Sequence, residues 1–113
     1  MSYHHKELAA GRWNTFSFFM QMANIGSEVG RTIKARLKNA NDSRLAAERA
    51  LELLDLTLED PKNHTSSRLK ELWRLREVMA DSLFFDNEYG STDASWATYF
   101  DAFTYAAALE RGV

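Results

Sequence analysis

The chain has 113 residues, of which 45% are hydrophobic and 27% are charged, a balance typical of one globular domain. Its formal net charge of -2 at pH 7 gives no bulk attraction to nucleic acid or acidic membranes, although it leaves room for a local basic patch. The absence of cysteine excludes disulfides, thiolate metal sites and cysteine nucleophiles, and it favours a reducing compartment.

The order of residues predicts an all-α protein. The sequence contains one proline and five glycines, which favours long helices over many short strands. No run of about 18 apolar residues occurs, and the N-terminus lacks the basic start and apolar core of a signal peptide. We therefore expect a cytoplasmic protein with no membrane contact, folded as a single antiparallel up-and-down four-helix bundle over residues 1–113.

The first predicted helix spans about residues 12–38, after a lead-in of residues 1–10. An apolar stripe at spacings of three and four runs along it, consisting of Phe16, Phe19, Ala23, Gly26, Gly30, Ile33 and Leu37. The middle of this stripe is small, which predicts the close approach of another backbone. Each mid-helix glycine costs roughly 0.5–1 kcal/mol relative to alanine, so tight packing is expected at both Gly26 and Gly30.

The same helix carries a second apolar stripe, made of Phe18, Met22, Ile25 and Val29. The two stripes together form a face wider than one neighbouring helix needs. Either this helix packs between two helices of its own chain, or the second stripe is an interface with another subunit. A third face carries Asn24, Glu28 and Arg31, whose spacing predicts a local polar network, with a polar contact site for a partner as the alternative.

Three further helices are predicted at about residues 43–59, 67–85 and 93–111. Each offers an apolar stripe that can pack on the first helix. In the third helix, Arg74 lies three residues from both Glu71 and Glu77, which predicts ion pairs on a solvated face. Several side chains are suited to cap the N-termini of these helices. They are Asp42 or Ser43 for the helix at 43–59, Thr65, Ser66 or Ser67 for the helix at 67–85, and Ser91 or Thr92 for the helix at 93–111.

No catalytic or cofactor signature is recognisable in the chain. A di-iron bundle needs Glu-x-x-His pairs, and none occurs. The spacing of zinc ligands and the phosphate-binding loop are absent too. The acidic loop at residues 86–93 offers oxygen atoms to a cation but lacks the ligand spacing of an EF-hand. We therefore predict no catalytic residue, no metal and no cofactor, in a protein that is not an enzyme.

The first two predicted helices resemble a known family in their small and polar positions. The residues that carry the resemblance are Gln21, Asn24-Ile25, Ser27-Glu28, Gly30-Arg31, Ala47, Ala50 and Glu59. The pattern is similar to that of the small four-helix bundle proteins encoded in ribosomal RNA intervening sequences, and of their relatives that accompany reverse transcriptases in diversity-generating retroelements. The resemblance implies a homo-oligomer, commonly a pentamer, that assists RNA, DNA or a reverse transcriptase.

The resemblance implies nucleic-acid binding, which in a chain of slightly negative charge depends on a local basic patch. The candidate residues are Arg31, Lys34, Arg36, Lys38, Arg44, Arg68, Lys70, Arg74 and Arg76. Phosphate contacts of this kind are sensitive to salt. The predicted function is a non-enzymatic oligomeric accessory or scaffold protein that binds nucleic acid, a reverse transcriptase or both. The alternative is a protein-only interaction or regulatory module, which the near-neutral charge favours.

Overall fold

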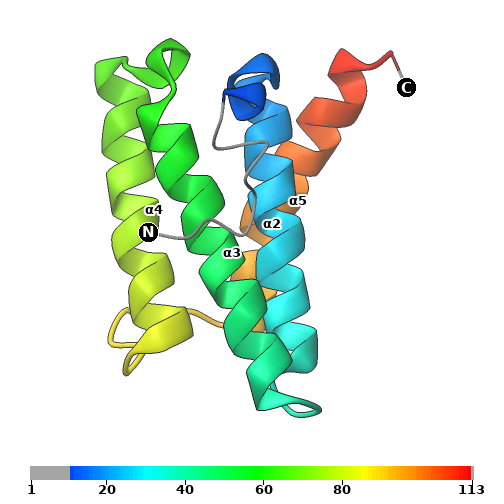
Figure 1. Cartoon of the computed structure of the whole chain (residues 1–113), viewed down its shortest axis with the longest axis vertical. Coiled ribbons are helices and arrows are strands. Elements are labelled where there is room, and N and C mark those ends of the chain that lie inside the picture. The colour runs from blue at the N-terminus through cyan, green and yellow to red at the C-terminus, as the bar shows by residue number, and fades with distance from the viewer. Residues whose placement is uncertain (1–10, 113) are drawn as a thin grey trace.

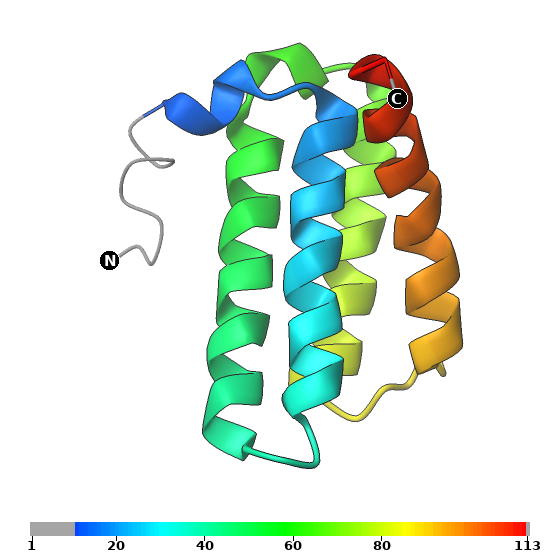
Figure 2. The same cartoon turned by 90° about the vertical axis from the view of Figure 1, so that its right-hand side faces the viewer.

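The computed structural model describes residues 11–112 and is all-helical over this range, with no strand. The predicted lead-in of residues 1–10 lies outside the described residues. The elements are η1 (Arg12–Thr15), α2 (Phe18–Ala35), α3 (Ala40–Glu59), η2 (Pro61–Asn63), α4 (Ser66–Phe84) and α5 (Asp93–Glu110). The long helices are α2, α3, α4 and α5, and they lie side by side as a bundle (Figures 1 and 2).

The first long helix begins later than the sequence predicts. Residues Arg12–Thr15 form the short 3-10 helix η1, and the backbone is extended at Phe16. Ser17 then caps α2, because its Oγ accepts a hydrogen bond of 3.1 Å from the backbone N–H of Met20. This break allows Trp13 to enter the core, where its Nε1 donates to a threonine hydroxyl of α3 at 3.0 Å.

The other helix boundaries follow from capping side chains. Asn39 caps α3 through its Oδ1, which accepts hydrogen bonds of 3.1 Å from two backbone N–H groups in the first turn. The helix therefore begins at Ala40 rather than at Ser43. Thr65 caps α4 and Thr92 caps α5, in agreement with the capping residues expected from the sequence.

The helix α2 is the centre of the bundle, since it packs most extensively on both α3 and α5, while α4 packs mainly on α3. At one end of α2, Ser17 donates a hydrogen bond of 2.6 Å to Glu110 at the end of α5. Just beyond the other end, Arg36 lies 3.4 Å from Asp93 at the start of α5. The two helices therefore run in opposite directions (Figure 2).

The stripe predicted as a subunit interface is instead the core-facing stripe of α2. Its members are at most 7% exposed and pack inside the chain's own hydrophobic core: Phe18, Met22, Ile25 and Val29. The expectation that this stripe meets another subunit is therefore corrected. The other stripe is less deeply buried, since Phe19 and Leu37 are exposed, whereas Gly26, Gly30 and Ile33 are half-buried. Both stripes are apolar, so the sequence pattern could not distinguish them.

A buried polar cluster joins η1, α2 and the connection between α3 and α4. The Gln21 Nε2 donates to the Trp13 carbonyl oxygen at 3.1 Å and to Asp60 Oδ2 at 2.8 Å. The Gln21 Oε1 accepts from Asn63 Nδ2 at 3.0 Å. All four residues are at most 3% exposed, and the Lys62 ammonium donates to Asp60 from the outer side. Gln21, a position of the family resemblance, therefore has a structural role in this fold.

Candidate functional site

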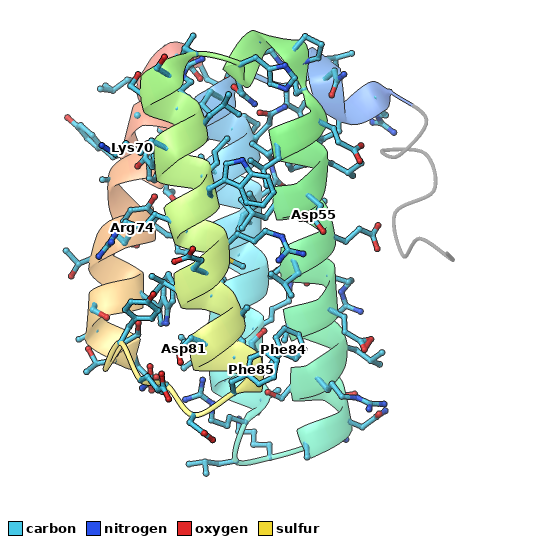
Figure 3. The ribbon with its side chains drawn as sticks, turned by 90° about the vertical axis from the view of Figure 1, so that its left-hand side faces the viewer. Asp55, Lys70, Arg74, Asp81, Phe84 and Phe85 are labelled. Atoms are coloured by element: carbon cyan, nitrogen blue, oxygen red, sulfur yellow. The ribbon has the colours of Figure 1, made fainter. Side chains whose placement is uncertain are left out.

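The outer face of α4 and the loop after it expose several large aromatic side chains. Trp73 is 57% exposed on α4, and Phe85 and Tyr89 in the loop are 75% and 56% exposed. Figure 3 shows Phe84 and Phe85 at the end of α4 that leads into the loop, whereas Lys70 and Arg74 lie on the edge of α4 that faces α5. We call this region the α4–loop surface and define it by Trp73, Glu77, Phe84, Phe85, Asp86, Glu88 and Tyr89.

The loop at residues 85–92 is held in place by Asp81, from the last turn of α4. The two carboxylate oxygens of Asp81 accept hydrogen bonds from the backbone N–H groups of Glu88, at 2.7 Å, and Tyr89, at 3.1 Å. Asn87 adopts φ 54°, a conformation that asparagine tolerates, and its side chain exchanges two hydrogen bonds of 2.9 Å with the backbone of Ser91. The exposed rings of Phe85 and Tyr89 therefore belong to a loop of defined conformation.

A groove of about 480 Å³ lies between this loop and α4. It is lined by Glu77, Ala80, Asp81, Phe85, Asp86, Glu88 and Tyr89. Asp81 is engaged with the loop backbone, and Glu77 accepts a hydrogen bond of 3.3 Å from the Tyr89 hydroxyl. The carboxylates of Asp86 and Glu88 have no hydrogen bond or ion pair with any other residue in 11–112. Free carboxylates beside exposed aromatic rings favour the binding of a cationic side chain.

A second hollow, a cleft of about 360 Å³, separates α4 from α5. Its lining includes the apolar side chains of Leu75, Val78 and Trp96. At its edge the Tyr99 hydroxyl donates to Glu71 at 3.0 Å. Burial, the negative charge of Glu71 and this hydrogen bond all raise the pKa of Tyr99 above its ordinary value. The Tyr99 phenol therefore loses its proton only at a higher pH than an ordinary tyrosine does.

The two ion pairs predicted for Arg74 do not form. Glu71 accepts its hydrogen bond from Tyr99 of α5, and Glu77 accepts its hydrogen bond from Tyr89 of the loop. Each tyrosine is far from Arg74 in the sequence, so helical spacing alone could not show that it would occupy these carboxylates. Arg74 lines the α4–α5 cleft and has no ion pair with any residue that the structure describes.

The nine basic residues predicted to bind nucleic acid are divided between two parts of the molecule. Five lie near the α2–α3 turn: Arg31, Lys34, Arg36, Lys38 and Arg44. Four lie on α4: Arg68, Lys70, Arg74 and Arg76. Four of the nine are engaged within the chain, as Arg31 with Glu28, Arg36 with Asp93, Arg76 with Asp55, and Arg68 over the ring of Phe18 at 4.4 Å. The other five make no such contact in the described range.

The polar network predicted on α2 is centred on Glu28. This buried carboxylate forms an ion pair with Arg31, and a second one with Arg49 of α3 at 3.0 Å. Asn24 is not a member, because its Nδ2 donates to the backbone carbonyl of Met20 at 2.8 Å. The sequence pattern missed Arg49 because this contact joins different helices.

Within residues 11–112, no group of three or more histidine, aspartate or glutamate side chains is placed to hold a metal ion. Over the same range, no helix has the length and apolar character needed to cross a membrane. No protein-family model, curated protein or solved structure matches the chain. The resemblance to the intervening-sequence and retroelement proteins therefore stays a prediction.

Proposed function

We propose that the protein is a non-enzymatic interaction module that binds a partner protein through the α4–loop surface. The observation that supports this most directly is the acid-lined groove beside the exposed rings of Phe85 and Tyr89. Aromatic residues are enriched at protein interfaces and often dominate their binding energy. The hydrogen bonds from the loop to Asp81 lower the cost of ordering these rings when a partner binds.

The composition of the groove suggests the chemistry of the partner. Asp86 and Glu88 carry carboxylates with no partner in the described chain, and no basic side chain lines the groove. A lysine or arginine inserted here gains both an ion pair and a favourable contact with an aromatic face. The partner is therefore a protein segment that presents basic side chains.

The proposed architecture is the one that the sequence predicts, a single antiparallel up-and-down bundle. It takes the chain as one domain whose four helices alternate in direction. Two contacts support this for α2 and α3. Ser43, near the start of α3, donates to the Thr32 carbonyl oxygen near the end of α2, whereas Thr57, near the end of α3, accepts from Trp13 just before α2. The direction of the ribbons in Figure 2 agrees with this order. A cytoplasmic location is also part of the proposal, and the absence of cysteine supports it.

Binding of labelled peptides tests this function. A lysine- and arginine-rich peptide is expected to bind the protein, whereas acidic and neutral peptides of equal length do not. Phe85→Ala, and the pair Asp86→Asn with Glu88→Gln, should each weaken this binding about tenfold. Glu59→Gln is the matched control, because Glu59 is an exposed acid on α3, outside the groove. Unchanged binding by the groove variants would exclude the site.

The second candidate function is that of a nucleoprotein accessory bound to RNA, DNA or a reverse transcriptase. Lys38 and Arg44 favour it, because both are exposed at the α2–α3 turn with no partner among the described residues. RNA binding measured over a range of salt concentrations is the test. Lys38→Glu with Arg44→Glu should abolish binding and reduce its dependence on salt. The absence of RNA and DNA binding even at low salt would exclude this function.

A further inference from the structure

We propose that a second copy of this chain docks on the face formed by α2 and α5, with a two-fold axis passing close to Gly30. Figure 2 views the molecule from the side on which α2 and α5 lie, whereas Figure 3 views the opposite side, where α4 and α3 lie. The proposed dimer is therefore independent of partner binding at the α4–loop surface. Four features of the α2–α5 face lead to this inference.

The first feature is the low charge of the exposed side of α5. From Ala94 to Leu109 the helix carries only one charged residue, Asp101. Ala97 and Thr104, which line the groove beside α2, are exposed, and Tyr105 is more than half exposed. A helix that is apolar on all sides is normally covered on all sides. The closely packed neighbour of α5 in this chain is α2, so its outer side is left for another molecule.

The second feature is a groove between the two helices that the chain itself leaves open. It has a volume of about 460 Å³, and Ser27, Gly30 and Ala97 are among its lining residues. The helix α2 adds no exposed charge between Phe19 and Gly30, because Glu28 is buried. The centre of the α2–α5 face is therefore lined by small side chains, and the charged groups of the groove lie to either side of Gly30.

The third feature is a glycine that no contact among residues 11–112 explains. A Cβ added to Gly30 meets no atom within 4 Å, whereas a Cβ added to Gly26 meets Phe100 at 2.7 Å. A glycine inside a helix costs stability relative to alanine. The close approach of a backbone from a second molecule would offset this cost at Gly30.

The fourth feature, a pair of opposite charges, selects a second copy as the occupant. Lys34 and Asp101 both line the groove, and neither has an ion pair with another residue of the described chain. Since α2 and α5 run in opposite directions and Gly26 faces Phe100, Lys34 and Asp101 lie on opposite sides of Gly30 along the groove. A two-fold axis near Gly30 brings Lys34 of each copy to Asp101 of the other, which forms two ion pairs at once.

The size of the face sets the expected strength of the dimer. Two helices of 18 residues lying side by side present roughly 27 Å by 20 Å, or about 500 Å² on each copy. The total of about 1,000 Å² is at the low end of specific interfaces. We therefore expect a reversible dimer with a dissociation constant in the micromolar range.

Sedimentation equilibrium of the full chain, from about 1 to about 500 µM, tests the proposal. The wild type should change from monomer to dimer over this range. Lys34→Glu and Asp101→Lys should each weaken the dimer about tenfold, because each places like charges together twice. The double variant should restore it, because the ion pairs reform with exchanged signs. Lys70→Glu, an exposed charge on α4, is the control and should leave the dimer unchanged.

Gly30→Leu provides a separate test of the two-fold axis. Because a Cβ at this position has open space in the monomer, the variant should fold normally by circular dichroism at low concentration while losing the dimer. A wild-type protein that stays monomeric throughout the range overturns the proposal. A dimer that tolerates Gly30→Leu, or one that the double charge exchange does not restore, overturns it as well. Phe85→Ala should leave the dimer intact, which separates this test from that of the partner-binding surface.

Discussion

Phe100 of α5 occupies the space that a side chain on Gly26 of α2 would need. A Cβ at position 26 would lie 2.7 Å from both the Cβ and the Cγ of Phe100, which is closer than real contacts allow. The close approach of α2 and α5 at this crossing therefore requires a glycine at position 26. Gly30, one turn further along the same stripe, has no such neighbour among the described residues, so the tight packing within the chain that the sequence predicts at both glycines is found at Gly26 only.

Matched alanine substitutions at these glycines should have opposite effects. Gly26→Ala is expected to lower the free energy of unfolding by about 1–3 kcal/mol, because Phe100 or the helix must shift. Gly30→Ala, measured in dilute monomeric protein, is expected to raise it by about 0.5–1 kcal/mol, since alanine is the better helix former. Urea unfolding followed by circular dichroism measures both. Equal effects would show that the register of α2 against α5 is different.

The sequence predicts the helical class well because helix formation depends on local patterns. Apolar periodicity locates all four long helices, and the caps Thr65 and Thr92 lie where the sequence places them. The rotation of α2 could not be predicted from apolar periodicity, because both stripes are apolar and the small residues at Gly26 and Gly30 suggest close packing on the wrong side of the helix. The start of α2 was also not predictable. The break at Phe16 allows Trp13 to enter the core and donate to Thr57, which is 44 residues away in the sequence.

The candidate site was predictable only in outline. The sequence marks the loop at residues 86–93 as acidic, but the role of Asp81 depends on how the chain turns back on α4. The hydrogen bonds of Glu71 with Tyr99 and of Glu77 with Tyr89 likewise join different elements of the chain. Such contacts between elements have no signature in the spacing of residues along one helix.

The buried carboxylate of Asp60 should make stability depend on pH. Burial alone would raise the pKa of Asp60, but hydrogen bonds from Lys62 and Gln21 and the Lys62 charge outweigh it, so the pKa lies below its ordinary value. A lowered pKa means that the carboxylate stabilises the fold above its ordinary pKa, and that this contribution disappears as the pH falls through the folded-state value.

Comparison of the wild type with Asp60→Asn tests this dependence. Near pH 6 the wild type should be more stable by about 1–3 kcal/mol, because the variant loses charge-assisted hydrogen bonds in a buried cluster. The difference should shrink as the pH is lowered below about 4, where the unfolded-state carboxyl and then the folded-state one become protonated. Chemical unfolding at a series of pH values provides the measurement. A difference that is constant across the series would mean that the charge of Asp60 is unimportant.

The two ion pairs of Glu28 should contribute unequally. The side chain of Arg31 is 64% exposed, whereas that of Glu28 is 7% exposed, so water screens the Arg31 pair from one side. Arg49 reaches the same carboxylate from α3 and links two helices at 3.0 Å. Arg31→Ala is expected to cost less than about 0.5 kcal/mol. Arg49→Ala should cost about 1–3 kcal/mol, because it leaves a buried carboxylate with one weak partner. Unfolding in urea that ranks the two variants in the reverse order would contradict this assignment.

Replacement of Asp81 should loosen the α4–loop surface without unfolding the bundle. The Asp81 carboxylate accepts hydrogen bonds from the backbone N–H groups of Glu88 and Tyr89. In the Asp81→Ala variant, both N–H groups would hydrogen-bond to water instead. Because these groups are exposed, Asp81→Ala should change the global free energy of unfolding by less than about 1 kcal/mol. Hydrogen exchange at the Glu88 and Tyr89 amides should accelerate about tenfold, while amides in α2 and α3 keep their protection. The basic peptide should also bind more weakly, although Phe85, Asp86 and Glu88 are intact, because the groove loses its defined shape. Unchanged exchange in the loop would show that Asp81 does not hold it.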